Sequence, residues 1–423
     1  MNHDLPIIII GCGIAGLVAC KQLVAQGAKV IVLEARDRPG GRIQTIQGEI
    51  ARIESGAEFI HGELPLTMKI LSNYNIGFHE IEGDMVRIEN DKAKRTSTFV
   101  DHWGKLMKSM KRLDDDMPFA EFLSKNFDDP IYEELRHSAT RFAEGFDLAD
   151  TRTASTLALY HEWEGDDDEP QFRIDEGYGA LVDALVKDCL NQGASIEFSA
   201  IVNRVEWERG KVKVFTTRGT SYSGSKVLIT VPIGVLQSSI QHPAHINFIP
   251  AIPHTTQSHN IGFGNVVKVV LECAEPFWHE RSKKASFFFT DEVIPTWWTQ
   301  LPRKETVLTG WLGGSGARAH ASKSDHALAE ISYESLAEIF EMTQSQVESA
   351  ISKTHIFNWS RDPFSLGGYS FSTIQSGEAR KLMNTPIEDT IYFAGEALYE
   401  GTGGGTVEAA ISSSMTASGL ILH

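Results

Sequence analysis

Three glycines near the start of the chain have the spacing of a phosphate-binding turn. Gly11, Gly13 and Gly16 follow a run of isoleucines, and the acidic residue Glu34 lies 23 residues after Gly11. The first glycine permits a tight turn, the second lets the backbone approach a pyrophosphate, and the third lets a helix pack closely on a strand. A carboxylate at the end of the next strand can accept hydrogen bonds from a ribose. The pattern therefore predicts a bound dinucleotide.

The elements around this turn must hold the glycines and the carboxylate in place. The apolar run 7–10 is typical of a parallel strand buried on both faces, 17–26 of a helix that stops at Gly27, and 30–33 of a second strand that ends on Glu34. The first N–H groups of such a helix are unpaired and lie at its positive end, so they attract phosphate. The spacing alone leaves one alternative, a glycine-rich turn in an unrelated α/β fold.

A second candidate for chemistry is Lys268, which interrupts the apolar segment GNVVKVVL at 264–271. A lysine inside an apolar strand is costly unless its ammonium group is paired or hydrated. This position therefore favours a lysine that serves a binding or catalytic site. The alternative is a strand lysine that faces solvent.

The bulk composition excludes some classes of protein. The 423 residues suffice for two or three domains, and the excess of 56 Asp and Glu over 39 Lys and Arg gives a charge of −17. That charge argues against a nucleic-acid partner and permits cationic substrates. The four cysteines lack metal or redox spacing, which favours buried thiols and no metal site. With no basic leader and no apolar stretch of about 18 residues, we expect a cytoplasmic protein without a membrane span.

Segments of the dinucleotide-binding type recur at the start, middle and end of the chain, with other material between them. This order indicates a discontinuous cofactor domain interleaved with a second lobe, and a site where the two meet. An acidic run, Glu162–Glu169, reads as a solvated loop. In chain order we expect a charged helical lobe at 101–163, a strand, glycine and helix at 173–185, short strands at 196–230 and 262–313, helix at 324–352, and a strand at 390–393 followed by a helix from Thr406.

Eight sequence blocks occur in a familiar order. They are IIIIGCGIAGL, LEARDRPGGR, SGAEFIHG, DEGYGALVDAL, VLITVPIGVL, GFGNVVKVVLECAEPFW, WSRDPFSLGGYS and YFAGEAL with GGGTVEAAISS. In these blocks the chain resembles the flavin-containing amine oxidases, a family that includes polyamine oxidases, monoamine oxidases and lysine-specific histone demethylases. The resemblance covers nearly the whole chain.

The resemblance implies a mixed α/β fold, in which a Rossmann-like FAD-binding domain is interleaved with a substrate-binding lobe of mixed sheet and helices. It also implies that FAD is bound noncovalently, because members with a covalent flavin carry a cysteine just before the site aromatic, where this chain has Gly368. The expected boundaries are 1–80, 175–236 and 355–423 for the FAD-binding domain, and 81–174 and 237–354 for the substrate-binding domain.

The family motifs assign parts of the cofactor to residues of this chain. Glu34 matches the acid that binds the adenosine ribose, Val205 the residue whose main chain reads the adenine, and Glu396 the acid near the ribityl–pyrophosphate. Trp359 is expected either against the flavin or in the core. The full set implied by the resemblance is Gly11, Gly13, Ile14, Ala15, Gly16, Glu34, Ala35, Arg36, Gly41, Arg42, Ala57, Glu58, Phe59, Val205, Trp359, Gly395, Glu396, Thr406 and Val407.

In this set Arg36 and Arg42 belong to the cofactor loop, and Glu58 and Phe59 pass their backbone along the flavin. Thr406 and Val407 open the final helix, whose N-terminus points at the pyrimidine end of the flavin in the family. The dipole and free N–H groups at that end would stabilise negative charge on the reduced flavin.

Four residues match the family's catalytic positions. Lys268 takes the place of a lysine that reaches flavin N5 through a water, and Tyr369 matches one wall of an aromatic cage. Thr406 replaces the opposite aromatic wall, as in the histone demethylases. His61 is the expected specificity residue, able to accept a hydrogen bond from a second amine, unless it is a buried structural histidine. Further carboxylate partners for a polycation are Glu144, Glu162 and Glu164.

The activity implied is oxidation of a C–N bond of a primary or secondary amine, with a polyamine-like substrate. Hydride transfer to flavin N5 gives an imine, hydrolysis gives an aldehyde and an amine, and O2 is reduced to H2O2. The amine must enter as its free base, which an apolar cleft favours.

Several rival functions stay open at this point. An L-amino-acid oxidase clamps its carboxylate with an arginine, which is absent from Gly56–Gly62 here. A desaturase or porphyrinogen oxidase would share the opening motif without requiring Lys268. A chromatin-type demethylase or scaffold would need a long helical insertion or a DNA-binding module, and a noncatalytic FAD-binding module is the simplest alternative.

Overall fold

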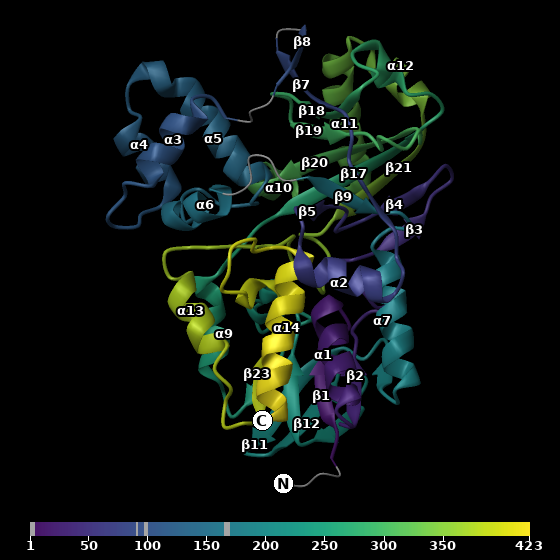
Figure 1. Cartoon of the computed structure of the whole chain (residues 1–423), viewed down its shortest axis with the longest axis vertical. Coiled ribbons are helices and arrows are strands. Elements are labelled where there is room, and N and C mark those ends of the chain that lie inside the picture. The colour runs from purple at the N-terminus through teal and green to yellow at the C-terminus, as the bar shows by residue number, and fades with distance from the viewer. Residues whose placement is uncertain (1–4, 90–91, 97–99, 165–169) are drawn as a thin grey trace.

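A parallel sheet of five strands forms the centre of the lower half of the molecule in Figure 1. The computed structural model describes residues 5–89, 92–96, 100–164 and 170–423. The apolar run 7–10 forms a parallel strand, β1, as predicted, and it lies between β2 and β14. The strand order is β10 (Ser195–Glu197), β2 (Val30–Leu33), β1 (Ile7–Ile10), β14 (Lys226–Ile229) and β23 (Ile391–Phe393).

Both faces of this sheet are covered. Ile9 packs in the cluster formed by helices α1 (Ile14–Ala25), α7 (Gly179–Asn191) and α14 (Val407–Leu422), while Ile8 and Ile10 point to the other face. A second sheet covers that face, with the order β13 (Ser221–Gly224), β12 (Lys211–Thr216), β11 (Val202–Glu208) and β15 (Asn247–Ile249). The α/β fold class is therefore confirmed.

A seven-stranded sheet dominates the upper half in Figure 1 and packs against helices α11 (Asp325–Phe340) and α12 (Gln344–Ala350). Its strand β17, which lies between the edge strand β21 and β20, is buried at every residue. The order is β21 (Ile351–Asn358), β17 (Val266–Cys273), β20 (Val307–Gly313), β19 (Thr296–Trp298), β18 (Ala285–Phe289), β7 (Asp84–Glu89) and β8 (Lys92–Arg95).

The expected helical lobe stands beside this sheet in Figure 1 and has its own aromatic core. Its helices are α3 (Trp103–Met110), α4 (Phe119–Asn126), α5 (Glu133–Gly145) and α6 (Thr156–Trp163). Of the acidic run at 162–169, residues 162–164 close α6, whereas 165–169 lie outside the described residues. In the described part of the chain, none of the helices has the length and hydropathy needed to cross a bilayer.

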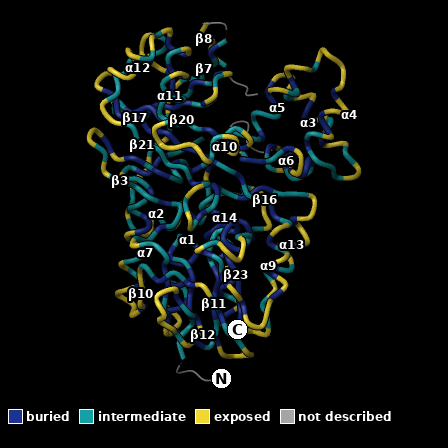
Figure 2. Tube along the Cα trace, turned by 180° about the vertical axis from the view of Figure 1, so that it is seen from behind, coloured by how far each residue is buried: buried dark blue, intermediate teal, exposed yellow. Residues whose placement is uncertain are grey.

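The buried centres of the two halves are dark blue in Figure 2, and shorter elements complete the fold. A hairpin of β3 (Thr45–Gln47) and β4 (Arg52–Glu54) lies against β17 in a small apolar cluster. The others are β5 (Ile60–His61), α2 (Pro65–Asn73), β6 (Phe78–Glu80), β9 (Gln171–Ile174), α8 (Ile233–Leu236), α9 (Pro253–Gln257), β16 (Gly262–Phe263), α10 (Gly314–His320), β22 (Ser370–Phe371), α13 (Ser376–Met383), and 3-10 turns at Pro130–Tyr132, Ser258–Asn260, Phe277–Glu280 and Glu396–Leu398.

The strand pairings differ from the boundaries expected from the sequence. β9 was assigned to the substrate-binding domain, but it pairs with β5 and β6 of the first segment. β15 falls within 237–354, yet it pairs with β11 of the sheet that covers the parallel sheet, and β21 crosses the expected boundary at 354. The partners of these pairings are far apart in the sequence, so motif order alone does not indicate them, and the expected boundaries stay a prediction.

Candidate active site

A cavity of about 730 Å³ lies where the two halves meet, and it is lined from both. This volume is in the range of ligand sites, about 300–1,000 Å³. It brings together all but two of the cofactor-binding and catalytic residues that the resemblance implied: Gly11, Gly13, Ile14, Ala15, Glu34, Ala35, Arg36, Gly41, Arg42, Ala57, Glu58, Phe59, His61, Lys268, Trp359, Tyr369, Gly395, Glu396, Thr406 and Val407.

The glycine turn has the geometry that its spacing predicted. Gly11 has a φ of +109°, and Gly13 caps the N-terminus of α1. Gly16 does not line the cavity, but a Cβ there would lie 2.0 Å from the Gly11 carbonyl oxygen. Gly16 therefore serves the close packing of helix on strand rather than contact with a ligand.

Glu34 holds the turn in place from the end of β2. Its carboxylate is almost fully buried and accepts hydrogen bonds from the backbone N–H of Cys12 at 2.8 Å and of Arg36 at 2.9 Å. Since a carboxylate has about four acceptor sites, it can still receive ribose hydroxyls from the cavity. The Arg36 guanidinium is held in turn by Asp362.

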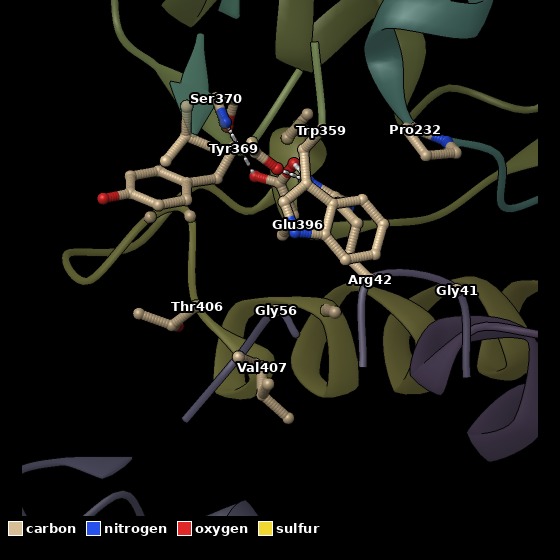
Figure 3. A pocket seen from close by; sticks show the side chains of 18 of the residues that line it. Gly41, Arg42, Gly56, Pro232, Trp359, Tyr369, Ser370, Glu396, Thr406 and Val407 are labelled. Atoms are coloured by element: carbon tan, nitrogen blue, oxygen red, sulfur yellow. Dashed lines mark hydrogen bonds and ion pairs between the residues drawn. The ribbon is translucent and has the colours of Figure 1, made fainter. Parts of the chain in front are cut away.

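Arg42 ties the cofactor loop to the last third of the chain (Figure 3). Its Nη1 donates to the Gly368 carbonyl at 2.6 Å and to Glu396 Oε1 at 2.9 Å. The other oxygen of Glu396 accepts from the Ser370 hydroxyl at 2.6 Å. These bonds fix the segment before Tyr369 against the glycine-rich side of the cavity.

The N-terminus of α14 faces the same cavity, next to Thr406 and Val407 in Figure 3. Thr406 is its N-cap: its Oγ1 accepts from Ala409 N at 3.1 Å and donates to the Gly403 carbonyl at 2.8 Å. The positive end of a 16-residue helix thus meets the cavity, where it favours negative charge.

The residue expected to read an adenine is placed differently. Val205 is fully buried in the middle of β11, between β12 and β15, and does not line the cavity. Val202, at the start of the same strand, lies there instead, with Ala200 and Ile201. The structure therefore does not bring Val205 to the cavity, because strand periodicity does not tell which residue of a strand lies at a ligand site.

These residues fit FAD. The backbone of the cofactor loop at Gly41 lies close to the backbone of the glycine turn at Gly13. A Cβ at Gly41 would lie 3.4 Å from the Gly13 Cα, in van der Waals contact with it. Glu34 would hold the ribose, the turn after β1 the pyrophosphate, and the N-terminus of α14 the electron-rich end of the flavin. The apolar and aromatic lining between them suits a flat ring system.

Lys268 is buried in β17, with 1% of its surface exposed, and it lines the cavity. Its Nζ donates to Glu58 Oε2 at 2.7 Å and to the Gly56 carbonyl at 3.2 Å. The structure therefore rules out the alternative of a solvent-facing lysine. Because an ammonium group has three donors, one N–H stays available for the cavity.

The carboxylate of Glu58 was missed by the sequence analysis, which assigned only the backbone of this residue to the site. Its Oε1 accepts from Arg173 Nε at 3.0 Å and from Trp298 Nε1 at 2.9 Å. Burial would raise the pKa of Glu58, but Lys268 and Arg173 outweigh it, so this pKa lies below its ordinary value. Glu58 is thus the anion that keeps two buried cations in place.

Aromatic rings close the cavity near Lys268. The ring of Tyr369 stacks on Trp311 at 6.5 Å and an interplanar angle of 19°, and Trp298 lies 6.0 Å from Trp311. The Tyr369 hydroxyl donates to the Phe146 carbonyl, and Trp359 Nε1 donates to the Ser55 carbonyl at 2.8 Å. Trp311 and Trp298 carried no local signal in the sequence beyond an aromatic-rich strand region.

His61 lies between two aromatic rings on the cavity wall, 6.0 Å from Phe59 and 5.7 Å from Phe146. Burial lowers its pKa to about 4, so the imidazole is neutral near pH 7. Its Nδ1 has no hydrogen-bond partner within the described chain. A neutral ring with an unpaired nitrogen can accept a hydrogen bond from a ligand.

Of the acids expected to meet a polycation, only Glu162 lines the cavity. Glu144 binds the Ser315 hydroxyl instead, and Glu164 lies on the surface near Lys111. Three arginines that were not foreseen, Arg87, Arg141 and Arg380, also line the cavity. Within the described residues, no group of three His, Cys, Asp or Glu side chains is placed to hold a metal ion.

Comparisons with known proteins agree with this geometry. Human lysine-specific histone demethylase 2 is 27% identical over 93% of the chain and 51% of its own length, and probable polyamine oxidase 4 of Arabidopsis thaliana is 26% identical over 98% and 87%. The solved structure of wild-type putrescine oxidase bound to putrescine has the same fold, with a TM-score of 0.82 at 20% identity and 99% coverage of both chains.

The first of these relatives is a longer protein, and the chain spans about half the length of the curated demethylases it matches. A family model described as flavin containing amine oxidoreductase matches residues 14–422, nearly the whole chain. The glycine turn, the cavity residues that fit FAD and this match agree, so the chain belongs to the flavin containing amine oxidoreductase family.

Proposed function

We propose that the protein is an FAD-dependent amine oxidase that acts on a C–N bond of a primary or secondary amine. The observation that carries this proposal is the buried Lys268 ammonium group, held by Glu58 on the wall of an aromatic-lined cavity. When bound, FAD supplies a two-electron acceptor whose reduced form O2 can reoxidise to release H2O2. The protein must supply orientation, dehydration and proton control.

The cavity residues suit an amine that reacts as its free base. Trp311, Trp298 and Tyr369 exclude water, and a low-polarity surrounding lowers the pKa of an amine and favours its lone pair. The remaining N–H of Lys268 can hold a water that carries protons in and out of the site. Oxidation of a free-base amine therefore does not require a strongly basic side chain in the cavity.

A polyamine-like substrate is the finer part of this proposal. Glu162 on the cavity wall can pair with a second, protonated amine, and the neutral His61 can accept a hydrogen bond from it. Thr406 in place of an aromatic wall leaves room for a secondary amine. The names of the relatives support amines of two kinds, polyamines and the methylated lysine of histone tails.

A substrate panel read by H2O2 release tests the activity and the substrate class together. The panel contains putrescine, spermidine, spermine, an acetylated polyamine, benzylamine, a peptide with N-methyllysine, and several L-amino acids. We expect peroxide from at least one polyamine and none from the amino acids. Peroxide from the peptide alone would mean that the substrate is a methylated lysine and not a polyamine. Peroxide from the amino acids alone would overturn the proposal.

A further inference from the structure

A second, much smaller cavity of about 30 Å³ is bordered by Glu58, the partner of Lys268. Glu58 is the one residue, among those described, that lines both this cavity and the large one. The small cavity is also bordered by Glu54, and it reaches Arg303 and Glu305, whose side chains are about a third exposed. It is large enough for one water.

Glu54 presents an unpaired oxygen there. Its Oε1 accepts from the Thr45 hydroxyl and from Tyr178 N, both at 2.8 Å. Its Oε2 is buried and has no hydrogen-bond partner within the described part of the chain. A buried carboxylate oxygen without a partner is costly, whereas a protonated carboxyl group or a nearby water would satisfy it.

The charges around Glu54 hold it near its titration point. Burial, helped by the Glu58 anion, raises the pKa of Glu54 to about 7, against opposing effects of Thr45, Lys268 and Tyr178 N. The small cavity also brings Arg52, Arg173, Arg303 and Glu305 toward this carboxyl group. Near neutral pH the group is therefore divided between its two protonation states.

We propose that Glu54 is a proton-exchange residue of the active site, which takes up and releases a proton through the small cavity and the Glu58–Lys268 pair. Uptake forms an O–H bond at Oε2 and release breaks it, and no electron moves at Glu54. The trigger is electrostatic: negative charge that enters the large cavity offsets the attraction of Lys268, so Glu54 binds its proton more tightly. The role in turnover rests on the proposed function.

An infrared titration of the holoprotein tests the proton-holding group directly. We expect a carboxylic-acid C=O band that disappears with a midpoint near pH 7 in the wild type and in Glu49→Gln, and is lost in Glu54→Gln. Glu49 is the control because it lies in the loop of the same hairpin, with a side chain 62% exposed. No such band in the wild type, or a band kept in Glu54→Gln, would overturn the proposal.

A second variant keeps the test informative should Glu54→Gln fail to fold. Glu58→Gln removes the anion that raises the pKa of Glu54, so the band should persist with its midpoint shifted to lower pH. An unshifted midpoint would show that the two carboxyl groups do not act on each other, contrary to the proposal.

Proton uptake on reduction tests the coupling to the large cavity. Reduction of bound FAD with dithionite in weak buffer, followed with a pH indicator, should consume more protons in the wild type than in Glu54→Gln between pH 7 and 8. Equal uptake by the two would contradict the coupling. Since dithionite replaces the amine, this result does not depend on whether an amine is the substrate.

Discussion

Strands β1 and β17 are both buried, but they meet the cavity in different ways. β1 consists of four isoleucines, brings no charged side chain to the cavity, and leads into the backbone of the turn at Gly11. β17 has eight buried residues and carries two charges, Lys268 and Glu272, on the same face. An apolar strand suffices to present backbone to a phosphate, whereas a side chain that acts on a reacting group must carry its charge into the core.

The hairpin of β3 and β4 and the loop after it make that charge tolerable. The loop supplies the Gly56 carbonyl and the Glu58 carboxylate to Lys268, and the hairpin supplies backbone N–H to Glu272, whose Oε1 also lies 2.7 Å from His355. Buried ion pairs add little stability relative to apolar residues of the same size. We infer that the Lys268 pair is retained for chemistry.

Removal of the Lys268 charge should give the largest effect. In Lys268→Met, FAD binding should persist, but turnover should fall about 100-fold because the proton-carrying water loses its anchor. The free energy of unfolding should also fall by about 3 kcal/mol, since Glu58 loses one of its two buried cationic partners. Steady-state peroxide release and thermal unfolding measure the two effects.

The other buried charge of β17 provides the matched control. Glu272→Gln should also lower stability, because one of the two carboxylate oxygens that meet His355 and Ile50 N becomes an NH2 group that cannot accept a hydrogen bond, yet leave turnover unchanged. An equal loss of turnover in both variants would mean that burial of charge in β17, and not the position of Lys268, matters for the reaction.

A side chain introduced at Gly16 tests the role of the backbone turn that follows β1. Gly16→Ala places a Cβ 2.0 Å from the Gly11 carbonyl, so the turn must move and FAD affinity should fall at least about 10-fold, with about 3 kcal/mol lost in stability. Gly419→Ala in α14, where a Cβ meets nothing within 4 Å, should be neutral or slightly stabilising. Flavin fluorescence on titration with FAD would detect the difference, and equal affinities would contradict the role of Gly16.

The raised pKa of Glu54 predicts how stability depends on pH. Between its ordinary pKa of 4.5 and about 7, the folded protein binds more protons at Glu54 than the unfolded chain does, so this residue makes stability fall as pH rises through that window. The total is about 3 kcal/mol. Glu54→Gln should flatten this slope in urea unfolding at pH 5 and pH 8, and an unchanged slope would argue against a buried, protonated Glu54.

The smallest effect concerns the helix that faces the flavin site. Thr406→Ala removes the N-cap of α14 and should cost about 1 kcal/mol, as Ser324→Ala should at the N-cap of α11. Only Thr406→Ala should also change the absorption spectrum of bound FAD, because α14 has its N-terminus at the cavity whereas α11 does not line it. Identical spectra for both variants would mean that α14 does not influence the flavin.

The two regions also differ in how well they could be predicted. The turn, Glu34 and α1 lie within a short stretch, so their spacing alone predicts their arrangement. Glu58 meets Arg173, Lys268 and Trp298 only after distant segments pair, and no local pattern indicates such a cluster. The placement of Val205 away from the cavity has a similar origin, since the sequence indicates the strand but not its position relative to the cavity.

Anaerobic mixing of the FAD-loaded protein with amines tests the central claim most directly. The account predicts that at least one amine of the panel bleaches the oxidised flavin band without O2, that the band returns when O2 is admitted, and that the return is slowed in Lys268→Met. A flavin that stays oxidised with every amine, but is bleached by a substrate that has no amine, would contradict it.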